Sequence, residues 1–129
     1  MLLNDIAIVD DNQLHRSLLR KLLEDDGFFV SVEEESGEAF IIALSNLSCV
    51  PAICIVDIRL PGISGYETIK HIKDKWPSIK VIAYTGTVEP TTVQQVIDCG
   101  ADFLLLKGEH PKKIIKTIED LFDDWKEGV

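Results

Sequence analysis

The sequence predicts an α/β fold in which a parallel sheet is covered by helices on both faces. Five short apolar runs of strand length recur along the 129 residues. The segments between these runs repeat their apolar residues with helical spacing. Because each predicted strand is followed by a predicted helix, consecutive strands must be joined by crossovers, which favour parallel pairing and right-handed connections.

The five predicted strands differ in how continuously apolar they are. They span residues 6–9, 28–32, 53–56, 81–84 and 103–106. The first, third and fourth are almost unbroken apolar runs, as expected of strands that are buried on both faces. The second is interrupted by Ser31 and continues into three glutamates, so we place it at an edge of the sheet. Five parallel strands with the second at an edge favour the doubly wound, flavodoxin-like order 2-1-3-4-5.

Five amphipathic helices are predicted between and after the strands. Their apolar stripes are Leu14, Leu18, Leu19, Leu22 and Leu23; Phe40, Ala43, Leu44 and Leu47; Ile69, Ile72 and Trp76; Val93, Val96 and Ile97; and Ile114, Ile115, Ile118, Leu121, Phe122 and Trp125. Residues that end or open helices agree with these boundaries, because Gly27 and Gly100 follow predicted helix ends and Pro111 can open the last helix. No internal repeat or linker divides the chain, so we expect residues 1–129 to form a single domain.

The composition excludes several classes of protein. Twenty-two acidic residues against 13 basic ones give a net charge of −9, which opposes attraction to nucleic acid or anionic lipid. No apolar stretch approaches the roughly 20 residues needed to cross a bilayer, and no secretion signal follows Met1. We therefore predict a cytoplasmic domain that binds neither nucleic acid nor membrane directly. The three cysteines lack metal-ligand spacing and predict reduced thiols without a disulfide.

Polar residues follow the predicted strands at the end where open parallel sheets bind their ligands. Asp10 and Asp11 follow the first strand, Asp57 the third, Thr85 the fourth and Lys107 the fifth. Taken singly, each has an ordinary interpretation: the paired aspartates could cap a helix, and the lysine could be a solvated surface residue. Together they predict that acids, a hydroxyl and an amine converge at one edge of the sheet.

Three carboxylates gathered at this edge require a cation, because unit charges about 4 Å apart interact by on the order of 4 kcal/mol at an intermediate dielectric. Lys107 supplies one positive charge, and Mg²⁺ suits the oxygen ligands better than zinc does. A phosphoryl group fits the same crevice, where Asp57 is the best candidate nucleophile and could hold an aspartyl phosphate. The Pro- and Gly-containing loop after Asp57 could direct a backbone carbonyl, for example that of Arg59, at the metal.

Over nearly its whole length, the chain resembles the receiver domains of two-component response regulators, the CheY-like superfamily. The resemblance rests on Asp10-Asp11, Asp57 with the Leu60-Pro61-Gly62-x-x-Gly65 loop, Thr85-Gly86, and Gly100-Ala101 ahead of Lys107. It implies that Asp57 accepts a phosphoryl group from a phosphohistidine of a sensor histidine kinase or a phosphotransfer protein. Asp11, Asp57 and the Arg59 carbonyl would then bind Mg²⁺ directly, and Asp10 would act mostly through water.

The same resemblance assigns the remaining roles. Thr85 would hydrogen-bond one phosphoryl oxygen after transfer, and Lys107 would pair with another. The phosphorylated state would alter the face formed by the fourth helix, the fifth strand and the fifth helix. That face would act on an output domain or an effector protein, and pairing of two copies after phosphorylation is a further option. The segment Glu109-His110-Pro111 resembles receivers attached to helix-turn-helix output domains.

Two residues depart from the usual pattern of the family. Leu104 stands where Tyr or Phe is usual three residues before the lysine, and Gly108 stands where many members have Pro. Because adjacent strand residues point to opposite faces, Phe103 does not simply replace the missing aromatic side chain.

Other functions are less well supported. A phosphohydrolase that uses Asp57 would usually carry a second acid two residues later, where this chain has Arg59. A nucleotide or flavin carrier would need a glycine-rich phosphate loop after the first strand, and none is present. A pseudo-receiver that acts by docking alone would not need the complete set of reactive residues. We therefore expect a signalling module, not an enzyme, that catalyses its own phosphorylation and dephosphorylation.

Overall fold

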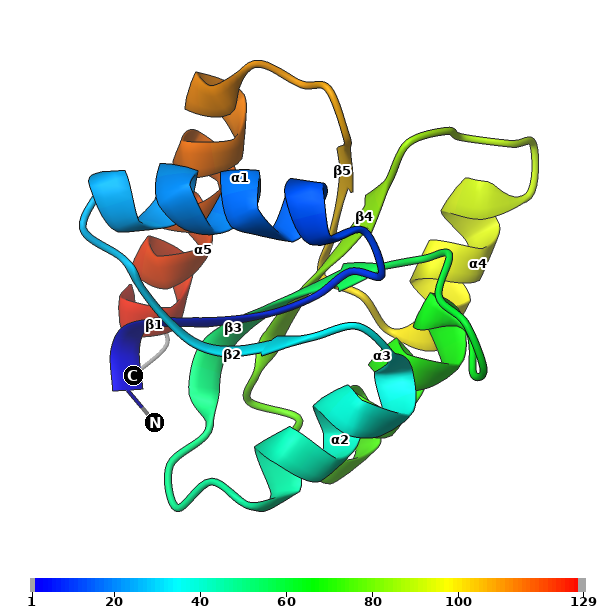
Figure 1. Ribbon diagram of the computed structural model, residues 1–129, viewed down its shortest axis with the longest axis horizontal. Helices are drawn as coiled ribbons and strands as arrows, with labels where there is room; N and C mark the ends of the chain where they lie inside the picture. Colours follow the sequence, from blue (N-terminus) through cyan, green and yellow to red (C-terminus); the bar gives the residue numbers. More distant parts are fainter. Residues whose placement is uncertain (1, 128–129) are drawn as a thin grey trace.

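The computed structural model describes residues 2–127, with side chains placed for residues 5–123. It contains a five-stranded parallel sheet in the order β2-β1-β3-β4-β5, with helices on both faces (Figure 1). The strands are β1 (Leu2–Val9), β2 (Phe29–Glu34), β3 (Pro51–Asp57), β4 (Lys80–Thr85) and β5 (Phe103–Leu106). The predicted fold class and strand order are confirmed.

A helix follows each strand. The helices are α1 (Gln13–Asp25), α2 (Gly37–Ser45), α3 (Gly65–Lys75), α4 (Thr92–Cys99) and α5 (Pro111–Glu127). Helices α1 and α5 cover one face of the sheet, and α2, α3 and α4 cover the other (Figure 1). Within the described part of the chain, no helix is long and apolar enough to cross a membrane.

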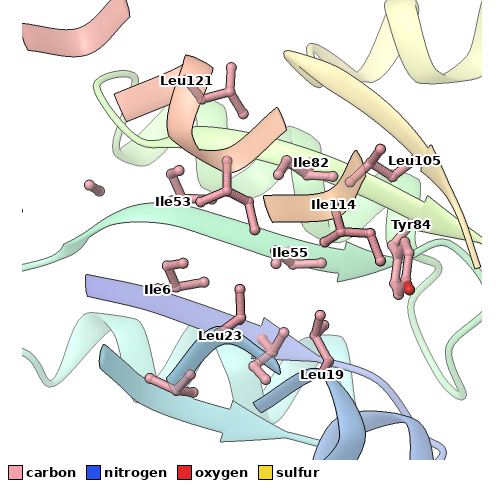
Figure 2. Packing of buried hydrophobic residues seen from close by; sticks show 14 of the residues in the cluster. Ile6, Leu19, Leu23, Ile53, Ile55, Ile82, Tyr84, Leu105, Ile114 and Leu121 are labelled. Atoms are coloured by element: carbon pink, nitrogen blue, oxygen red, sulfur yellow. The ribbon is translucent and has the colours of Figure 1, made fainter. Parts of the chain in front are cut away.

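The sheet separates two apolar cores because alternate residues of each strand point to opposite faces. Ile6 and Ile8 of β1 pack toward α1 and α5. Figure 2 shows Ile6 in this core, near Ile53 of β3 and Leu23 of α1. Ala7 and Val9 of the same strand pack toward the opposite helices. All seven residues of β3 are buried, so the central strand holds its last residue, Asp57, in a rigid position.

Strand β2 lies at the edge, as its sequence predicts, and its burial is incomplete. Its pairing with β1 shifts register: Ile6 lies opposite Val30, but Ala7 lies opposite Val32. Ser31 is therefore an extra residue on β2, which is the geometry of a β-bulge. The serine that interrupts the apolar run marks an irregularity in the pairing as well as the edge of the sheet.

The apolar stripes of α1 and α4 are wider than the surfaces that these helices bury. Leu19 and Leu23 of α1 are buried, whereas Leu14 is 66% exposed and Leu18 is 59% exposed. Successive residues turn by about 100° around a helix, so Leu14 and Leu18 lie at one margin of the stripe. On α4, Val93 and Ile97 are likewise exposed while Val96 is buried. The side chain of Trp125, predicted to end the last stripe, lies outside the described residues.

No disulfide links the three cysteines, all of which lie in the described part of the chain. Cys54 and Cys99 are buried in the core on the α2, α3 and α4 side. Burial raises the pKa of the Cys54 thiol, so this group remains protonated and acts as a small apolar side chain.

Candidate functional site

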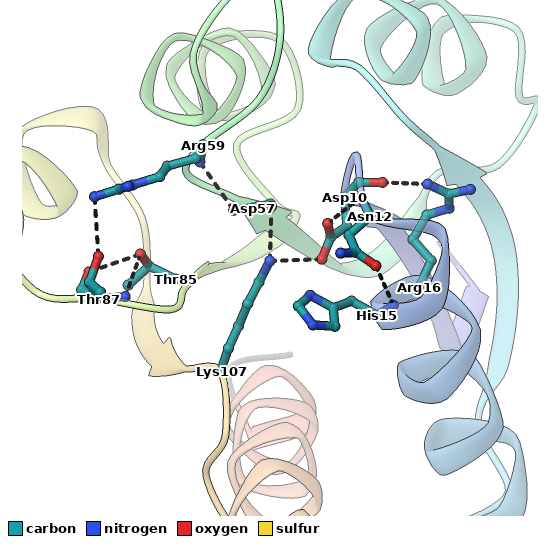
Figure 3. Close-up of polar contacts among 9 residues, drawn as sticks. All are labelled: Asp10, Asn12, His15, Arg16, Asp57, Arg59, Thr85, Thr87 and Lys107. Carbon is teal, nitrogen blue, oxygen red and sulfur yellow. Dashed lines mark hydrogen bonds and ion pairs between the residues drawn. The ribbon is translucent and has the colours of Figure 1, made fainter.

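The sheet gathers the predicted site residues at the carboxyl ends of its strands, and Figure 3 shows Asp10, Asp57, Thr85 and Lys107 there. Asp57 is the last residue of β3 and lies opposite Tyr84 of the neighbouring strand. Thr85 ends β4 and pairs with Leu106, the residue before Lys107. Asp10 follows β1, the strand that pairs with β3 on the side away from β4. Residues from four strands therefore meet because parallel strands end at the same edge.

Three carboxylates form the centre of the site. One oxygen from each of Asp10, Asp11 and Asp57 lies within 4.8 Å of the others. Asp10 and Asp57 are buried, whereas Asp11 is exposed to solvent. Hard oxygen ligands with one open side suit Mg²⁺, which keeps several waters and uses few protein ligands. The three predicted acids thus form a donor set that fits this ion.

Lys107 supplies the positive charge within the site. Its Nζ lies 3.0 Å from Asp57 Oδ2 and 3.0 Å from Asp10 Oδ2. Burial alone would lower the pKa of Lys107, but its hydrogen bonds and charge interactions with the two aspartates raise the pKa overall. Lys107 is therefore a cation at neutral pH. It bridges two acids that would otherwise repel each other.

Burial raises the pKa of Asp57 above its ordinary value. The hydrogen bond and charge of Lys107 oppose this shift, and the neighbouring charge of Asp10 adds to it. The Arg59 backbone N–H also lowers the pKa by donating to Asp57 Oδ1 at 3.1 Å. Asp57 is thus a poorly solvated carboxylate whose charge is stabilised by specific partners, which is the environment of a candidate nucleophile.

The acids after β1 do not cap α1. The N-cap is Asn12, whose Oδ1 accepts a hydrogen bond from His15 N at 3.0 Å. Asp10 Oδ1 accepts from Asn12 N at 2.8 Å, and the Asp10 carbonyl accepts from Arg16 Nη1 at 2.5 Å. The capping role that Asp10 and Asp11 could have had therefore falls to Asn12, and their carboxylates lie in the site.

The loop after Asp57 ends at Gly65, a position that has no room for a side chain. A Cβ atom at this position would lie 2.2 Å from the Asp57 carbonyl oxygen and 2.5 Å from Ile58 Cα. The Gly65 N–H donates to the Ile58 carbonyl at 2.8 Å. Helix α3 then begins with Ser64 as its N-cap. The absence of a side chain lets α3 start directly against the end of β3.

The Thr85 hydroxyl is engaged within its own loop. Its Oγ1 donates to the Thr87 carbonyl at 2.9 Å and accepts from the Thr87 N–H at 3.4 Å. The same loop contacts the Arg59 side chain, whose Nη2 donates to Thr87 Oγ1 at 3.1 Å and to Glu89 Oε1 at 2.8 Å. The sequence indicated a possible role for the Arg59 carbonyl. It did not predict these contacts of the Arg59 side chain, because Thr87 and Glu89 lie about 30 residues further along the chain.

An aromatic side chain that the sequence did not place at the site, Tyr84, lies beside Lys107. The Lys107 ammonium lies 5.8 Å from the centre of the Tyr84 ring. Leu104 packs against the core on the α2, α3 and α4 side, and Phe103 is 42% exposed.

Gly108 has a φ of 90°, which proline cannot adopt. Glycine at this position therefore permits a backbone conformation that proline would exclude.

Comparison with known proteins identifies the family. The sequence-family model described as the response regulator receiver domain matches residues 6–119. The chain therefore belongs to this family. It is 30% identical over 118 residues to the response regulator GacA of Pseudomonas protegens, covering 91% of this chain and 54% of GacA. It is 32% identical over 113 residues to the nitrate/nitrite response regulator protein NarP of Escherichia coli K12, covering 88% of this chain and 52% of NarP.

The fold is also that of solved receiver structures. A CheY-like response regulator receiver domain protein from Methanospirillum hungatei superimposes with a TM-score of 0.91 at 23% identity, covering 99% of this chain and 100% of that one. At this level of identity the match concerns the fold alone. The chain spans about half the length of the curated relatives GacA and NarP.

Proposed function

We propose that this chain is the phosphoacceptor module of a two-component phosphorelay, in which residues 1–129 form one receiver domain. Asp57 takes a phosphoryl group from the phosphohistidine of a sensor histidine kinase or a phosphotransfer protein. The observation that carries the proposal is the position of Asp57, buried at the end of β3 with Lys107 Nζ 3.0 Å from its Oδ2. A carboxylate held in this way can attack phosphorus without first losing a full hydration shell.

The residues that would hold Mg²⁺ are Asp10, Asp11 and Asp57, together with the Arg59 carbonyl. The ion, when bound, would neutralise charge on the phosphoryl oxygens. The carboxylate cluster supports this assignment because its three oxygens lie within 4.8 Å of one another. Asp11 is exposed, so its carboxylate can bind the ion directly. As the resemblance to receiver domains implies, Asp57 would also bind the ion directly and Asp10 would act mostly through water.

During transfer, an Asp57 oxygen forms a bond to phosphorus while the bond between phosphorus and the imidazole nitrogen breaks. The electron pair of the broken bond remains on the imidazole, which leaves. Lys107 then exchanges its contact with Asp57 for one with a phosphoryl oxygen. Thr85 exchanges its hydrogen bond to the Thr87 carbonyl for one to another phosphoryl oxygen. These two exchanges couple the phosphoryl group to β4 and β5.

The face formed by α4, β5 and α5 would report the phosphorylated state. Val93, Ile97 and Phe103 are 52%, 61% and 42% exposed there, so this face presents apolar side chains to a partner. GacA and NarP are about twice as long as the matched region, which supports a partner that is an output domain of the same chain. A separate effector and a second phosphorylated copy would use the same face. We place this activity in the cytoplasm, without direct binding of nucleic acid or membrane by this domain.

The test is intact mass after incubation with acetyl phosphate and Mg²⁺. The wild-type protein is expected to gain one phosphoryl group, and Asp57→Asn is expected to gain none. A chelator should abolish the gain, and Asp74→Asn, at an exposed position on α3, should leave it unchanged. The proposal fails if the wild type gains no phosphoryl group or if Asp57→Asn gains one equally well.

A further inference from the structure

An exposed ion pair connects the two loops on either side of the phosphoacceptor. Arg59 lies in the loop after β3, and Glu89 lies in the loop between β4 and α4. Arg59 Nη2 is 2.8 Å from Glu89 Oε1 and 3.1 Å from Thr87 Oγ1. The same arginine donates its backbone N–H to Asp57 (Figure 3). One residue therefore contacts both the candidate nucleophile and the loop that leads into α4.

Glu89 is in turn tied to the first turn of α4. Its backbone N–H donates to Thr92 Oγ1 at 2.9 Å, and its carbonyl accepts from the Thr92 N–H at 3.0 Å. The N-cap residue Thr91 makes no side-chain capping hydrogen bond, so this reciprocal pair fastens the start of the helix to the loop. A displacement of Glu89 would be transmitted directly to the beginning of α4.

The ion pair is weak enough to be broken by a competing anion. The side chains of Arg59 and Glu89 are 68% and 64% exposed, and exposed pairs typically contribute about 0–1 kcal/mol. A phosphoryl group on Asp57 would carry more negative charge than one carboxylate and could accept two parallel hydrogen bonds from a guanidinium. It would also repel Glu89. Both effects favour transfer of Arg59 from the glutamate to the phosphoryl oxygens.

We propose that Arg59 and Glu89 form a phosphoryl-sensitive latch. In the unphosphorylated protein, the latch holds residues 86–92 against the loop after β3. When Asp57 is phosphorylated, the Arg59 guanidinium leaves Glu89 for the phosphoryl oxygens, and the start of α4 is released. This inference rests on the proposed function, because it requires a phosphoryl group on Asp57. It adds a defined contact through which α4 responds to that group.

Amide hydrogen exchange of residues 86–92, measured with and without acetyl phosphate and Mg²⁺, tests the latch. In the wild type, exchange in this segment should accelerate on phosphorylation. In Glu89→Gln, it should already be about two- to fivefold faster without phosphoryl donor, which corresponds to the loss of an exposed ion pair. The further acceleration on phosphorylation should then be small. Asp120→Asn, which removes the exposed pair with Lys116 on α5, should behave as wild type in this segment.

A second background identifies the partner of Glu89. In Arg59→Gln, the additional change Glu89→Gln should leave exchange in residues 86–92 unaltered, because the pair is already broken. Intact mass is recorded on every sample. A wild type that gains no phosphoryl group overturns the proposed function and the latch together. A wild type that is phosphorylated while residues 86–92 exchange at an unchanged rate overturns the latch alone, and so does a Glu89→Gln variant with wild-type exchange.

Discussion

The single ammonium group of Lys107 offsets the negative charges of two buried aspartates. Its removal should therefore affect the stability of the site more than removal of an exposed charge would. Asp10 and Asp57 each place Oδ2 at 3.0 Å from its ammonium. Removal of one partner from a buried ion pair is costly because the remaining charge stays desolvated and unpaired. At this position two carboxylates would be left without their shared cation. The lysine therefore stabilises the fold as well as the candidate chemistry.

We expect Lys107→Met to lower the free energy of unfolding by roughly 2–4 kcal/mol at pH 7 without Mg²⁺. The loss should shrink as the pH falls toward about 3, below the ordinary pKa of an aspartate, because burial raises the pKa of Asp57 and its neutral carboxyl group does not need a cation beside it. Urea unfolding at the two pH values measures this difference. Lys116→Met, at an exposed position of α5, should show no comparable effect. An equal loss at both pH values would mean that the lysine stabilises the protein by packing and not by charge.

At the scale of elements, the junction between β3 and α3 positions Asp57. Gly65→Ala would introduce a Cβ only 2.2 Å from the Asp57 carbonyl oxygen. The first turn of α3 or the end of β3 must then move, and a shift of the end of β3 displaces the Asp57 carboxylate. We expect the variant to lose about 1–3 kcal/mol of stability, a typical cost of overpacking, and to accept a phosphoryl group more slowly than wild type.

Urea unfolding and the rate of mass gain with acetyl phosphate measure the two effects of Gly65→Ala. Gly86→Ala is a matched control for stability, because a Cβ there meets nothing within 4 Å. Retention of wild-type stability and phosphorylation in Gly65→Ala would show that the junction has room to adjust. Close packing of α3 against β3 would then not be the reason for a glycine at this position.

The sequence predicted the elements well where burial is complete. The five strands and their order follow from apolar continuity and from strict alternation with helices, and β3 is buried throughout. Strands β1, β3 and β4 extend further than their apolar cores, and β2 is shifted toward its glutamates. Periodicity did not reveal that Leu14, Leu18 and Ile97 are exposed. An apolar residue follows the same spacing whether it meets the sheet or solvent.

The sequence predicted the part of the candidate site that lies at the strand ends, but not the contacts between its loops. Residues at the ends of parallel strands must lie at one edge, so Asp10, Asp57 and Lys107 could be brought together from the sequence alone. The link between Arg59 and Glu89 could not. It depends on the path of two loops, and no local spacing relates residues 30 positions apart.

At the scale of the whole molecule, Asp5 is an acid that the fold buries away from the site. It lies toward the start of β1, is 2% exposed, and has no hydrogen-bond partner for either carboxylate oxygen within the described part of the chain. Burial raises the pKa of Asp5, and polar interactions with the Ser31 side chain and with the backbone of Ser31 and Ile6, none of which has full hydrogen-bond geometry, offset this only in part. The fold tolerates this charge at a cost in stability, because a desolvated carboxylate has lost its hydration without full compensation.

The raised pKa of Asp5 predicts the direction of the pH dependence. Between the ordinary pKa of 3.8 and the higher pKa of the folded state, the folded protein binds more protons than the unfolded chain. The contribution of Asp5 to stability therefore falls as the pH rises through this interval. We expect Asp5→Asn to increase the free energy of unfolding at pH 7 by roughly 1–3 kcal/mol, because the neutral amide avoids the larger desolvation penalty of an unpaired buried charge. The increase should disappear below about pH 3.8, where the carboxyl group is neutral in both states.

Urea unfolding of wild type and Asp5→Asn across this pH range measures the effect as the difference between two curves. The subtraction cancels the contributions of Asp57 and the other acids, which both proteins share. Asp74→Asn, at an exposed position on α3, should give a curve that matches wild type. If Asp5→Asn were no more stable than wild type at pH 7, the buried carboxylate would have to be compensated in the folded state. Ser31, whose Oγ also lacks a partner in the described residues, would then be the first side chain to test.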